Sequence, residues 1–224
     1  MALAYLWGSV PTAYLLVRWV RGQDIRRLGS GNVGASNVTA AFGPRLGLAL
    51  GAFDAAIKGT LPVVVVALLG RETGLQIAVG AAAVVGHNWS PFIRFTGGRG
   101  VAAALGVYFG LGMIMWPQLI MLLLVAGGWG WYLRKNLAFW MAVAMAAAPV
   151  MAWLLGQPDQ VAFGSAAIFA VLMAKRLTGN WERPAEGEPL ARVLAYRLLY
   201  DRDIASNEAW VRRGIAREAE GRGG

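Results

Sequence analysis

The residues best suited to chemistry form a glycine-punctuated run between residues 28 and 37. Glycines let the backbone adopt positive φ and aim several N–H groups at one point. Arg26, Arg27 and Arg45 flank the run and raise its electrostatic potential. Its candidate functional residues are Ser30, Gly31, Asn32, Gly34, Ser36 and Asn37. This composition is typical of a loop that binds phosphate oxygens.

A second candidate anion site is the glycine turn that precedes an expected helix beginning at Val101. Such a turn leaves unpaired backbone N–H groups and the positive end of the helix dipole facing outward. A plain turn between short membrane helices would have a similar sequence, but its pairing with the first loop favours an anion site. The residues involved are Arg94, Thr96, Gly97, Gly98, Arg99 and Gly100.

Ionisable residues also occur inside apolar segments. Asp54 and Lys58 have i, i+4 spacing, which places them on one helix face as a structural ion pair or as a polar wall of an active cavity. His87 is the sole histidine, so it is either a structural group near a helix end or a proton carrier. The absence of cysteine excludes thiolate catalysis and disulfides, and no metal-ligand spacing or P-loop is visible.

The composition is that of an integral membrane protein. Hydrophobic residues make up 57% of the chain, charged residues 15%, and the mean hydropathy is +0.50. We predict an all-α polytopic fold with about seven transmembrane helices. The run after Gly100 is too long for one span, so we expect it to divide near residues 110–112 and Pro117. The apolar segments are residues 2–20, 46–70, 75–93, 101–115, 117–133, 137–155 and 160–174.

The charge distribution predicts the topology. With seven spans and the N-terminus outside, nearly all Lys and Arg residues fall on one side, while the other holds little more than Arg71, Glu72 and Asp159. The positive-inside rule places the basic side, both glycine-rich segments and the C-terminus in the cytoplasm. Attraction to anionic lipid accounts for the net charge of +9, and we expect no nucleic-acid partner.

The chain divides into a membrane domain, residues 1–188, and a basic tail, residues 189–224. The first part of the tail has leucines at helical spacing that alternate with Arg192 and Arg197, as in an amphipathic helix on lipid headgroups. A solvated extension is the alternative for residues 201–224.

The ordered motifs resemble those of the bacterial acyl-phosphate:glycerol-3-phosphate acyltransferase family. The resemblance covers about residues 5–188 and includes five elements at family-like spacing. These elements are Gly8-Ser9-Val10-Pro11, residues 24–38, Lys58-Gly59 with Leu61-Pro62, Gly86-His87, and residues 95–101.

The resemblance implies an enzyme of the bacterial inner membrane that moves an acyl chain from acyl-phosphate to the first hydroxyl of glycerol 3-phosphate, giving lysophosphatidic acid. It implies no acyl-CoA, metal or other cofactor, and we expect a monomer whose partners are its two substrates and membrane lipid. The expected catalytic residues are Ser30, Asn32, Asn37 and Asn180, which lie in the matching motifs, together with Arg45 as a compensating cation. The expected substrate-binding residues are Gly31, Gly34, Lys58, His87, Arg94, Thr96, Gly97, Gly98, Arg99 and Gly100.

The chain departs from the family pattern at several positions, three of which are substitutions of functional side chains. Ala40 replaces an arginine, Leu177 replaces the histidine of an Arg-His-x-x-Asn motif, and Arg99 replaces a lysine. Loss of a charge-assisted phosphate contact costs roughly 1.5–3 kcal/mol. We expect either Arg45, five residues beyond Ala40, or Arg27, three residues before Ser30, to compensate for Ala40, and we expect Arg45→Ala to lower transfer far more than Arg71→Ala.

Two other functions remain open at this point. The lost family residues fit a diverged paralogue that binds a phosphorylated lipid or polyol without this transfer, or that uses another alcohol. A small transporter using Asp54 and Lys58 would show inverted repeats, and none is visible in the sequence. No serine–histidine–acid arrangement is visible either, so we expect no acyl-enzyme at Ser30.

Overall fold

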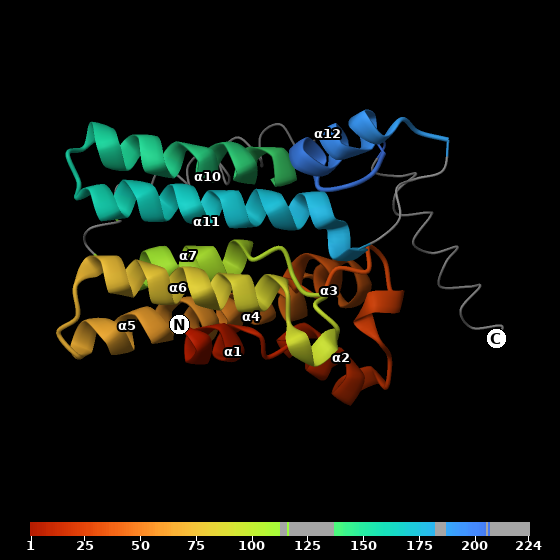
Figure 1. The fold of residues 1–224 in the computed structure, drawn as a ribbon. Coiled ribbons are helices and arrows are strands. Elements are labelled where there is room, and N and C mark those ends of the chain that lie inside the picture. Colours follow the sequence, from red (N-terminus) through yellow and green to blue (C-terminus); the bar gives the residue numbers. More distant parts are fainter. Residues whose placement is uncertain (113–115, 117–136, 182–186, 205, 207–224) are drawn as a thin grey trace.

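The structure is a computed structural model that describes residues 1–112, 116, 137–181, 187–204 and 206. Its regular elements in these ranges are helices, which lie side by side in two layers (Figure 1). One layer contains α10 (Leu137–Leu154) and α11 (Asp159–Thr178), with α12 (Leu190–Tyr200) at one end of the pair. This confirms a mostly helical fold.

The second layer is formed by the central helices of the first half of the chain. It contains the continuous helical stretch of α4 (Pro44–Phe53), η2 (Asp54–Thr60) and α5 (Leu61–Leu68), together with α6 (Thr73–Asn88) and α7 (Val101–Gly110). Contacts between α6 and α11 join the two layers. The short helices α1 (Ala2–Gly8), α2 (Thr12–Arg21) and α3 (Ala35–Phe42) lie around this layer.

Three of the described helical stretches are long and apolar enough to cross a membrane: Pro44–Leu68, Leu137–Leu154 and Asp159–Trp181. The expected span at residues 2–20 is not one helix, because α1 ends at Gly8 and α2 begins at Thr12. Pro11 lacks a backbone N–H and disfavours helical conformation in the residue before it, which explains the break. The expected span at residues 117–133 lies outside the described residues, so seven spans remain a prediction.

A π-helical segment, η2, interrupts the longest apolar stretch. The Leu61 N–H donates to the carbonyl of Ala56, five residues earlier, instead of the usual four. Pro62 cannot donate a backbone hydrogen bond, which favours this local change of helical pitch. The π-helical turn contains both Asp54 and Lys58, and such segments are frequent at functional sites.

Close backbone packing holds η2 against α7. A Cβ atom added to Gly59 would collide with the Ala103 carbonyl oxygen, and one added to Gly106 would collide with the carbonyl oxygen of Ala55. Small residues at helix interfaces permit this approach, which is the usual way membrane helices associate. The main apolar core lies between this pair and the other long helices, and it includes Val84, Val107, Met145 and Ile168.

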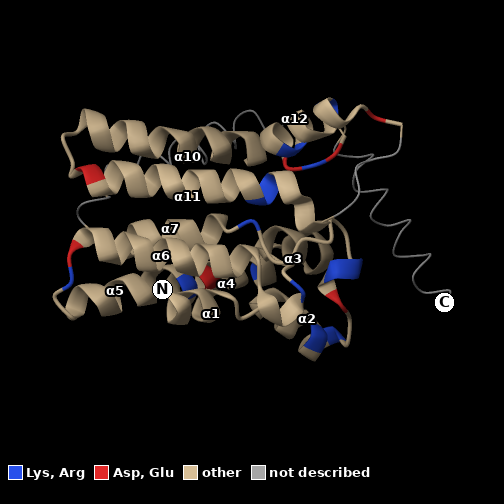
Figure 2. Ribbon diagram, viewed as in Figure 1, with Lys and Arg blue, Asp and Glu red and all other residues tan. Residues whose placement is uncertain are grey.

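Charged residues are separated along the helices. Arg71, Glu72 and Asp159 lie at one end, where α5 connects to α6 and where α11 begins (Figure 2). We call the opposite end, where α2, α6 and α11 end and α7 begins, the motif end. The described part of both glycine-rich segments lies there, together with most of the described Lys and Arg residues (Figure 2).

The beginning of the tail packs on the motif end. The expected helix is present as α12, and it contacts both α10 and α11. Arg192 is exposed and pairs with Glu188 at 3.1 Å, whereas Arg197 is buried at 6% exposure. One face of α12 is therefore covered by the membrane domain. Residues 207–224 lie outside the described residues.

Candidate active site

The two glycine-rich segments meet at the motif end. We define the first loop as residues 28–34 and the glycine turn as residues 94–100. The Val33 N–H donates to the carbonyl of Gly97 at 3.3 Å. An added Cβ on Gly34 would lie 3.7 Å from the Cα of Gly98. The two candidate anion cradles therefore share one site.

Asn37 fixes the shape of the first loop from the start of α3. Its side-chain NH2 donates to the carbonyls of Ile25, Leu28 and Asn32 at 2.9–3.2 Å, and its Oδ1 accepts from the N–H of Ser30 at 3.2 Å. Asn37 is buried at 2% exposure. These contacts give it a positioning role in the structure, and its predicted catalytic role stays a prediction.

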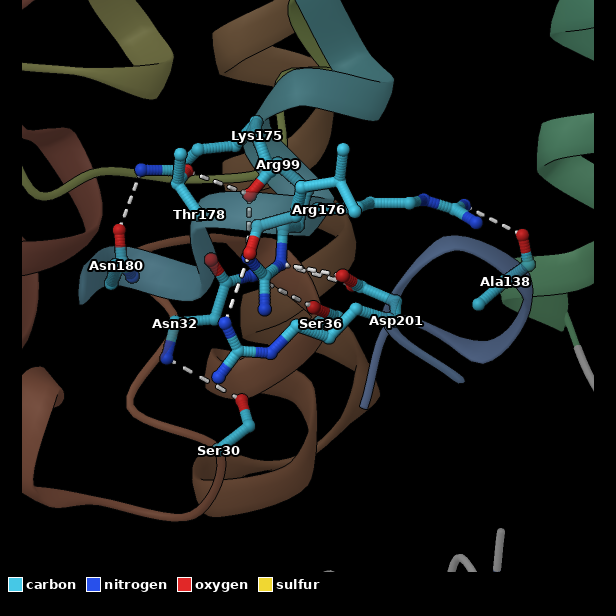
Figure 3. A network of polar contacts seen from close by, with 12 residues as sticks. Ser30, Asn32, Ser36, Arg99, Ala138, Lys175, Arg176, Thr178, Asn180 and Asp201 are labelled. Carbon is cyan, nitrogen blue, oxygen red and sulfur yellow. Dashed lines mark hydrogen bonds and ion pairs between the residues drawn. The ribbon is translucent and has the colours of Figure 1, made fainter. Parts of the chain in front are cut away.

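Asn32 is the amide of the first loop with spare hydrogen-bonding capacity. Its backbone N–H contacts Ser30 Oγ at 3.5 Å, and its side-chain NH2 donates to Ser36 Oγ at 3.4 Å (Figure 3). Its Oδ1 is buried without a hydrogen-bond partner among the described residues. Because a buried acceptor without a donor is costly, this oxygen is suited to a ligand hydroxyl or a water.

The end of α6 supports the glycine turn from below. The Gly98 N–H donates to the carbonyl of His87 at 3.1 Å. A Cβ on Gly97 would collide with the carbonyls of His87 and Asn88, and a Cβ on Gly98 would collide with Nε2 of the His87 ring. Glycine is therefore required at both positions by space. Both amide atoms of Asn88 are buried without a partner in the described part of the chain.

A buried polar cluster lies beneath His87. Lys58 pairs with Asp54 at 2.9 Å and lies 3.3 Å from His87 Nδ1. The Thr12 hydroxyl donates to Asp54 at 2.6 Å and accepts from Lys58 at 2.9 Å. Asp54, Lys58 and His87 are 1%, 3% and 7% exposed. The short Asp54–Lys58 distance supports their interpretation as an ion pair. The cluster also contacts the glycine turn, because the His87 ring lies next to Gly98.

The short helix η6 (Gly179–Trp181), which directly follows α11, contacts the glycine turn on the side opposite α6. The Asn180 side chain accepts from the Gly97 N–H at 3.0 Å and donates to the Gly97 carbonyl at 3.1 Å. Lys175 donates to Asn180 Oδ1 at 2.6 Å, and its ammonium group lies 5.4 Å from the centroid of the Trp89 ring. Asn180 thus hydrogen-bonds to both the N–H and the carbonyl of Gly97, and Lys175 holds the Asn180 side chain in place.

Arg99 is the cation that projects from the glycine turn into this network. Its Nε lies 2.8 Å from one carboxylate oxygen of Asp201 and donates to the other at 3.0 Å (Figure 3). Its Nη1 donates to the carbonyl of Lys175 at 3.3 Å. The predicted phosphate-binding residue is therefore connected to both α11 and the tail.

Left-handed backbone conformations cluster around the site. Among the described residues, five non-glycine residues have positive φ, between 56° and 67°, and all five lie at the motif end: Arg94, Phe95, Asn180, Trp181 and Asp201. Such conformations cost about 1–3 kcal/mol each and concentrate at functional sites. The Trp181 indole donates to the Phe95 carbonyl at 3.2 Å and connects two of these turns.

A small recess opens between the cradles and the polar cluster. Its lining residues are Ser9, Val10, Pro11, Val33, Lys58, His87, Ser90, Ile93, Gly97 and Gly98. It therefore connects the buried charges of η2 to the glycine turn.

Most of the predicted site residues come together here. The assembled set is Ser30, Gly31, Asn32, Gly34, Asn37, Lys58, His87, Gly97, Gly98, Arg99, Gly100 and Asn180. Thr96 donates to the carbonyl of Ile93 within the turn, and Arg94 is exposed. Arg45 is exposed in the first turn of α4 and has no hydrogen bond to the other described site residues.

Three participants were missed in the sequence: Asn88, Lys175 and Asp201. Lys175 directly precedes the Arg176-x-x-x-Asn180 motif, which could have drawn attention to it. Nothing in the sequence connects Asp201 with Arg99, 102 positions away. Leu177, at the position of the family histidine, contributes its backbone carbonyl, which accepts from Arg197 at 2.9 Å.

Comparison with known proteins identifies the family of this chain. The family model described as glycerol-3-phosphate acyltransferase matches residues 1–187. Glycerol-3-phosphate acyltransferase 4 of Dehalococcoides mccartyi (strain CBDB1) is 40% identical over 225 residues, covering 98% of this chain and 94% of that protein. The glycerol-3-phosphate acyltransferase of Myxococcus xanthus (strain DK1622) is 49% identical over 117 residues, covering 52% of this chain and 58% of that protein.

Two crystal structures of PlsY (YgiH), an integral membrane glycerol 3-phosphate acyltransferase, have the same fold. The glycerol 3-phosphate form is 28% identical with a TM-score of 0.72, covering 93% of this chain and 95% of that one. The lysophosphatidic acid form is 29% identical with a TM-score of 0.67, covering 82% and 93%. By sequence and by fold, this chain belongs to the glycerol-3-phosphate acyltransferase family.

Proposed function

We propose that this protein transfers an acyl group from acyl-phosphate to the first hydroxyl of glycerol 3-phosphate, giving lysophosphatidic acid. The single observation that carries the proposal is the junction of the two cradles, where the Val33 N–H donates to the Gly97 carbonyl at 3.3 Å. Both substrates contain phosphate, and one shared site that combines Arg99 with the hydroxyl and amide side chains of the first loop can hold them next to each other.

The residues of the site have complementary roles in this reaction. Arg99 binds the phosphate of glycerol 3-phosphate as a multidentate cation. The buried Oδ1 of Asn32 accepts a hydrogen bond from a glycerol hydroxyl, which gives this otherwise unpartnered oxygen a donor. The Ser30 hydroxyl donates to the phosphate that leaves and stabilises it.

The transfer can take place in one step, without a covalent bond between the acyl group and the enzyme. The hydroxyl oxygen attacks the acyl carbonyl carbon, the bond between that carbon and the phosphate oxygen breaks, and inorganic phosphate leaves with the hydroxyl proton. His87 is not positioned as a base for Ser30, because Lys58 engages its Nδ1 and Gly98 covers its Nε2. We therefore propose direct transfer, with no acyl group on Ser30.

We also propose that the motif end faces the cytoplasm of a bacterial inner membrane. Support comes from the separation of charge, with Arg71, Glu72 and Asp159 at the far end and the basic residues at the motif end (Figure 2). The proposal includes seven spans, an external N-terminus and a monomeric enzyme. In this orientation the site opens beside the inner leaflet, where a fatty acyl chain can enter from lipid.

The test is an assay of the purified full chain in detergent with palmitoyl phosphate and radiolabelled glycerol 3-phosphate. We expect labelled lysophosphatidic acid and an equal amount of inorganic phosphate, and no product with palmitoyl-CoA. Saturable binding of glycerol 3-phosphate without product would contradict the proposal and support a binding paralogue. Mass spectrometry of the reacting enzyme should find no acyl group on Ser30.

Matched arginine variants connect the activity to the site. Arg99→Ala should raise the KM for glycerol 3-phosphate about ten- to a hundredfold, because it removes a charge-assisted contact worth about 1.5–3 kcal/mol. Arg71→Ala, an exposed arginine at the far end, is the control and should leave the KM unchanged. Equal effects of the two substitutions would argue against a phosphate site at the glycine turn.

A further inference from the structure

The tail places a carboxylate beside the proposed phosphate-binding arginine. Asp201 directly follows α12, and both of its carboxylate oxygens lie 2.8–3.0 Å from Arg99 Nε. The Arg99 and Asp201 side chains are only 15% and 23% exposed, so water weakens this pair little compared with a surface pair. The contact crosses from the membrane domain to a segment outside the motifs that resemble the family.

Several contacts fix Asp201 in this position. Arg197 in the last turn of α12 pairs with Asp203 at 2.6 Å and donates to the carbonyl of Leu177 at 2.9 Å. Arg176 donates to the carbonyl of Leu198 at 2.7 Å. Asp201 itself has a left-handed backbone, with φ of 57°, and its N–H caps α12 by donating to the Arg197 carbonyl. The end of α12, and Asp201 with it, is therefore attached to α11 and is not a free chain end.

Among the described residues, the contacts of Arg99 leave most of its guanidinium available. A guanidinium has five N–H donors. Asp201 engages Nε, and the Lys175 carbonyl engages one N–H of Nη1. The remaining donors, one on Nη1 and two on Nη2, are enough for a bidentate phosphate contact. Asp201 thus orients the planar group while leaving its outer donors for an anion.

We propose that Asp201 is a positioning residue that orients Arg99 toward the phosphate of glycerol 3-phosphate. This inference rests on the proposed function. It also gives a physical reason for arginine where the family pattern has lysine: a planar guanidinium binds phosphate well only when its plane is fixed, whereas an ammonium acts as a point charge. Arg99 and Asp201 therefore function as a coupled pair.

The test is steady-state kinetics of full-length variants in a double-mutant cycle. Asp201→Ala should raise the KM for glycerol 3-phosphate about tenfold, with kcat changed less than about twofold, because it removes one charge-assisted hydrogen bond of the Arg99 clamp. Asp201→Glu should recover part of the loss. In the Arg99→Lys background, Asp201→Ala should leave the KM unchanged or lower it, since only the repulsion between carboxylate and phosphate is then removed.

Arg192→Ala is the matched control, because Arg192 lies on the same helix in an exposed pair and should have wild-type KM. Thermal unfolding of each variant distinguishes a misfolded protein from one in which only the Arg99 side chain is misoriented. If Asp201→Ala does not fold, Asp201→Asn, which keeps the shape of the side chain, replaces it. An unchanged or lower KM for Asp201→Ala in the wild-type background would overturn the inference, as would equal increases in both backgrounds. Absence of product from the wild-type chain would instead refute the proposed function.

Discussion

The first loop and the glycine turn form one site but are built in different ways. Asn37 holds the first loop through partners 5–12 residues away. The glycine turn depends on Asn180, 83 positions from Gly97, and Arg99 depends on Asp201, 102 positions away. One half of the site is thus a local unit, and the other exists only after α6, α11 and α12 have packed together. Damage to the first half should stay local, whereas damage to the second should spread.

The largest effect is expected from Gly98→Ala. An added Cβ would collide with Nε2 of His87, which is fixed below by Lys58, so the backbone of the turn must move. A displacement of about 1 Å at a reacting centre can lower the rate about a hundredfold, and we expect at least that loss in kcat/KM. The control is Gly74→Ala on the same helix layer, where the added Cβ meets Gln160 at an ordinary 3.5 Å. Similar losses in both variants would contradict the role of the turn.

The next effect distinguishes local from long-range support. Asn37→Ala removes four hydrogen bonds, so residues 25–32 should open more easily by about 2–4 kcal/mol. Asn180→Ala removes the two bonds to Gly97 and the partner of Lys175, so faster amide exchange should extend from residues 94–100 to the end of α11. Hydrogen exchange by mass spectrometry measures both patterns. If Asn37→Ala also released the end of α11, the first loop would not be a local unit.

A smaller effect tests the cation of the first loop. The family pattern has an arginine at the position of Ala40, and Arg45 is the proposed replacement. Arg45→Ala should raise the KM for one phosphate substrate about tenfold, equivalent to about 1.4 kcal/mol, while Arg71→Ala has no effect. Because Arg45 is exposed in this structure, it would have to turn inward when substrate binds. Equal, small effects of the two substitutions would show that the first loop works without this cation.

The smallest effect concerns the entrance to the first loop, where Asp24 pairs with Arg26 at 2.6 Å. Burial acts to raise the pKa of Asp24, but hydrogen bonds from Arg26 outweigh it, so the pKa of Asp24 lies below its ordinary value. A lowered folded-state pKa gives stability that is present above the unfolded-state pKa and is lost as the pH falls through the folded-state pKa. Between about pH 5 and 3, the free energy of unfolding should therefore fall slightly more for wild type than for Asp24→Asn, by at most about 1 kcal/mol, which thermal unfolding across this pH range measures. An identical pH profile would show that the pair contributes nothing.

The same contrast explains what could be predicted from the sequence. Glycine and amide spacing indicated the first loop because its contacts are local, and the i, i+4 spacing of Asp54 and Lys58 indicated their pairing. The break of the first apolar segment at Pro11 was missed because hydropathy outweighed the effect of one proline. Asp201 was missed because its partner, Arg99, lies 102 positions away and is brought close only by tertiary packing. Lys175 is only five positions from its partner Asn180 and was missed although that contact is local. Local patterns therefore predicted both glycine-rich segments, but not the distant carboxylate that supports the glycine turn.

The most direct test of the account is hydrogen exchange of the full-length protein titrated with glycerol 3-phosphate. If the first loop and the glycine turn form one substrate site, peptides covering residues 28–34 and 94–100 should gain protection together, with one half-saturation concentration. The connection between α5 and α6, around Arg71, is the internal control and should not change. Protection of only one segment, or two different half-saturation concentrations, would contradict a shared site.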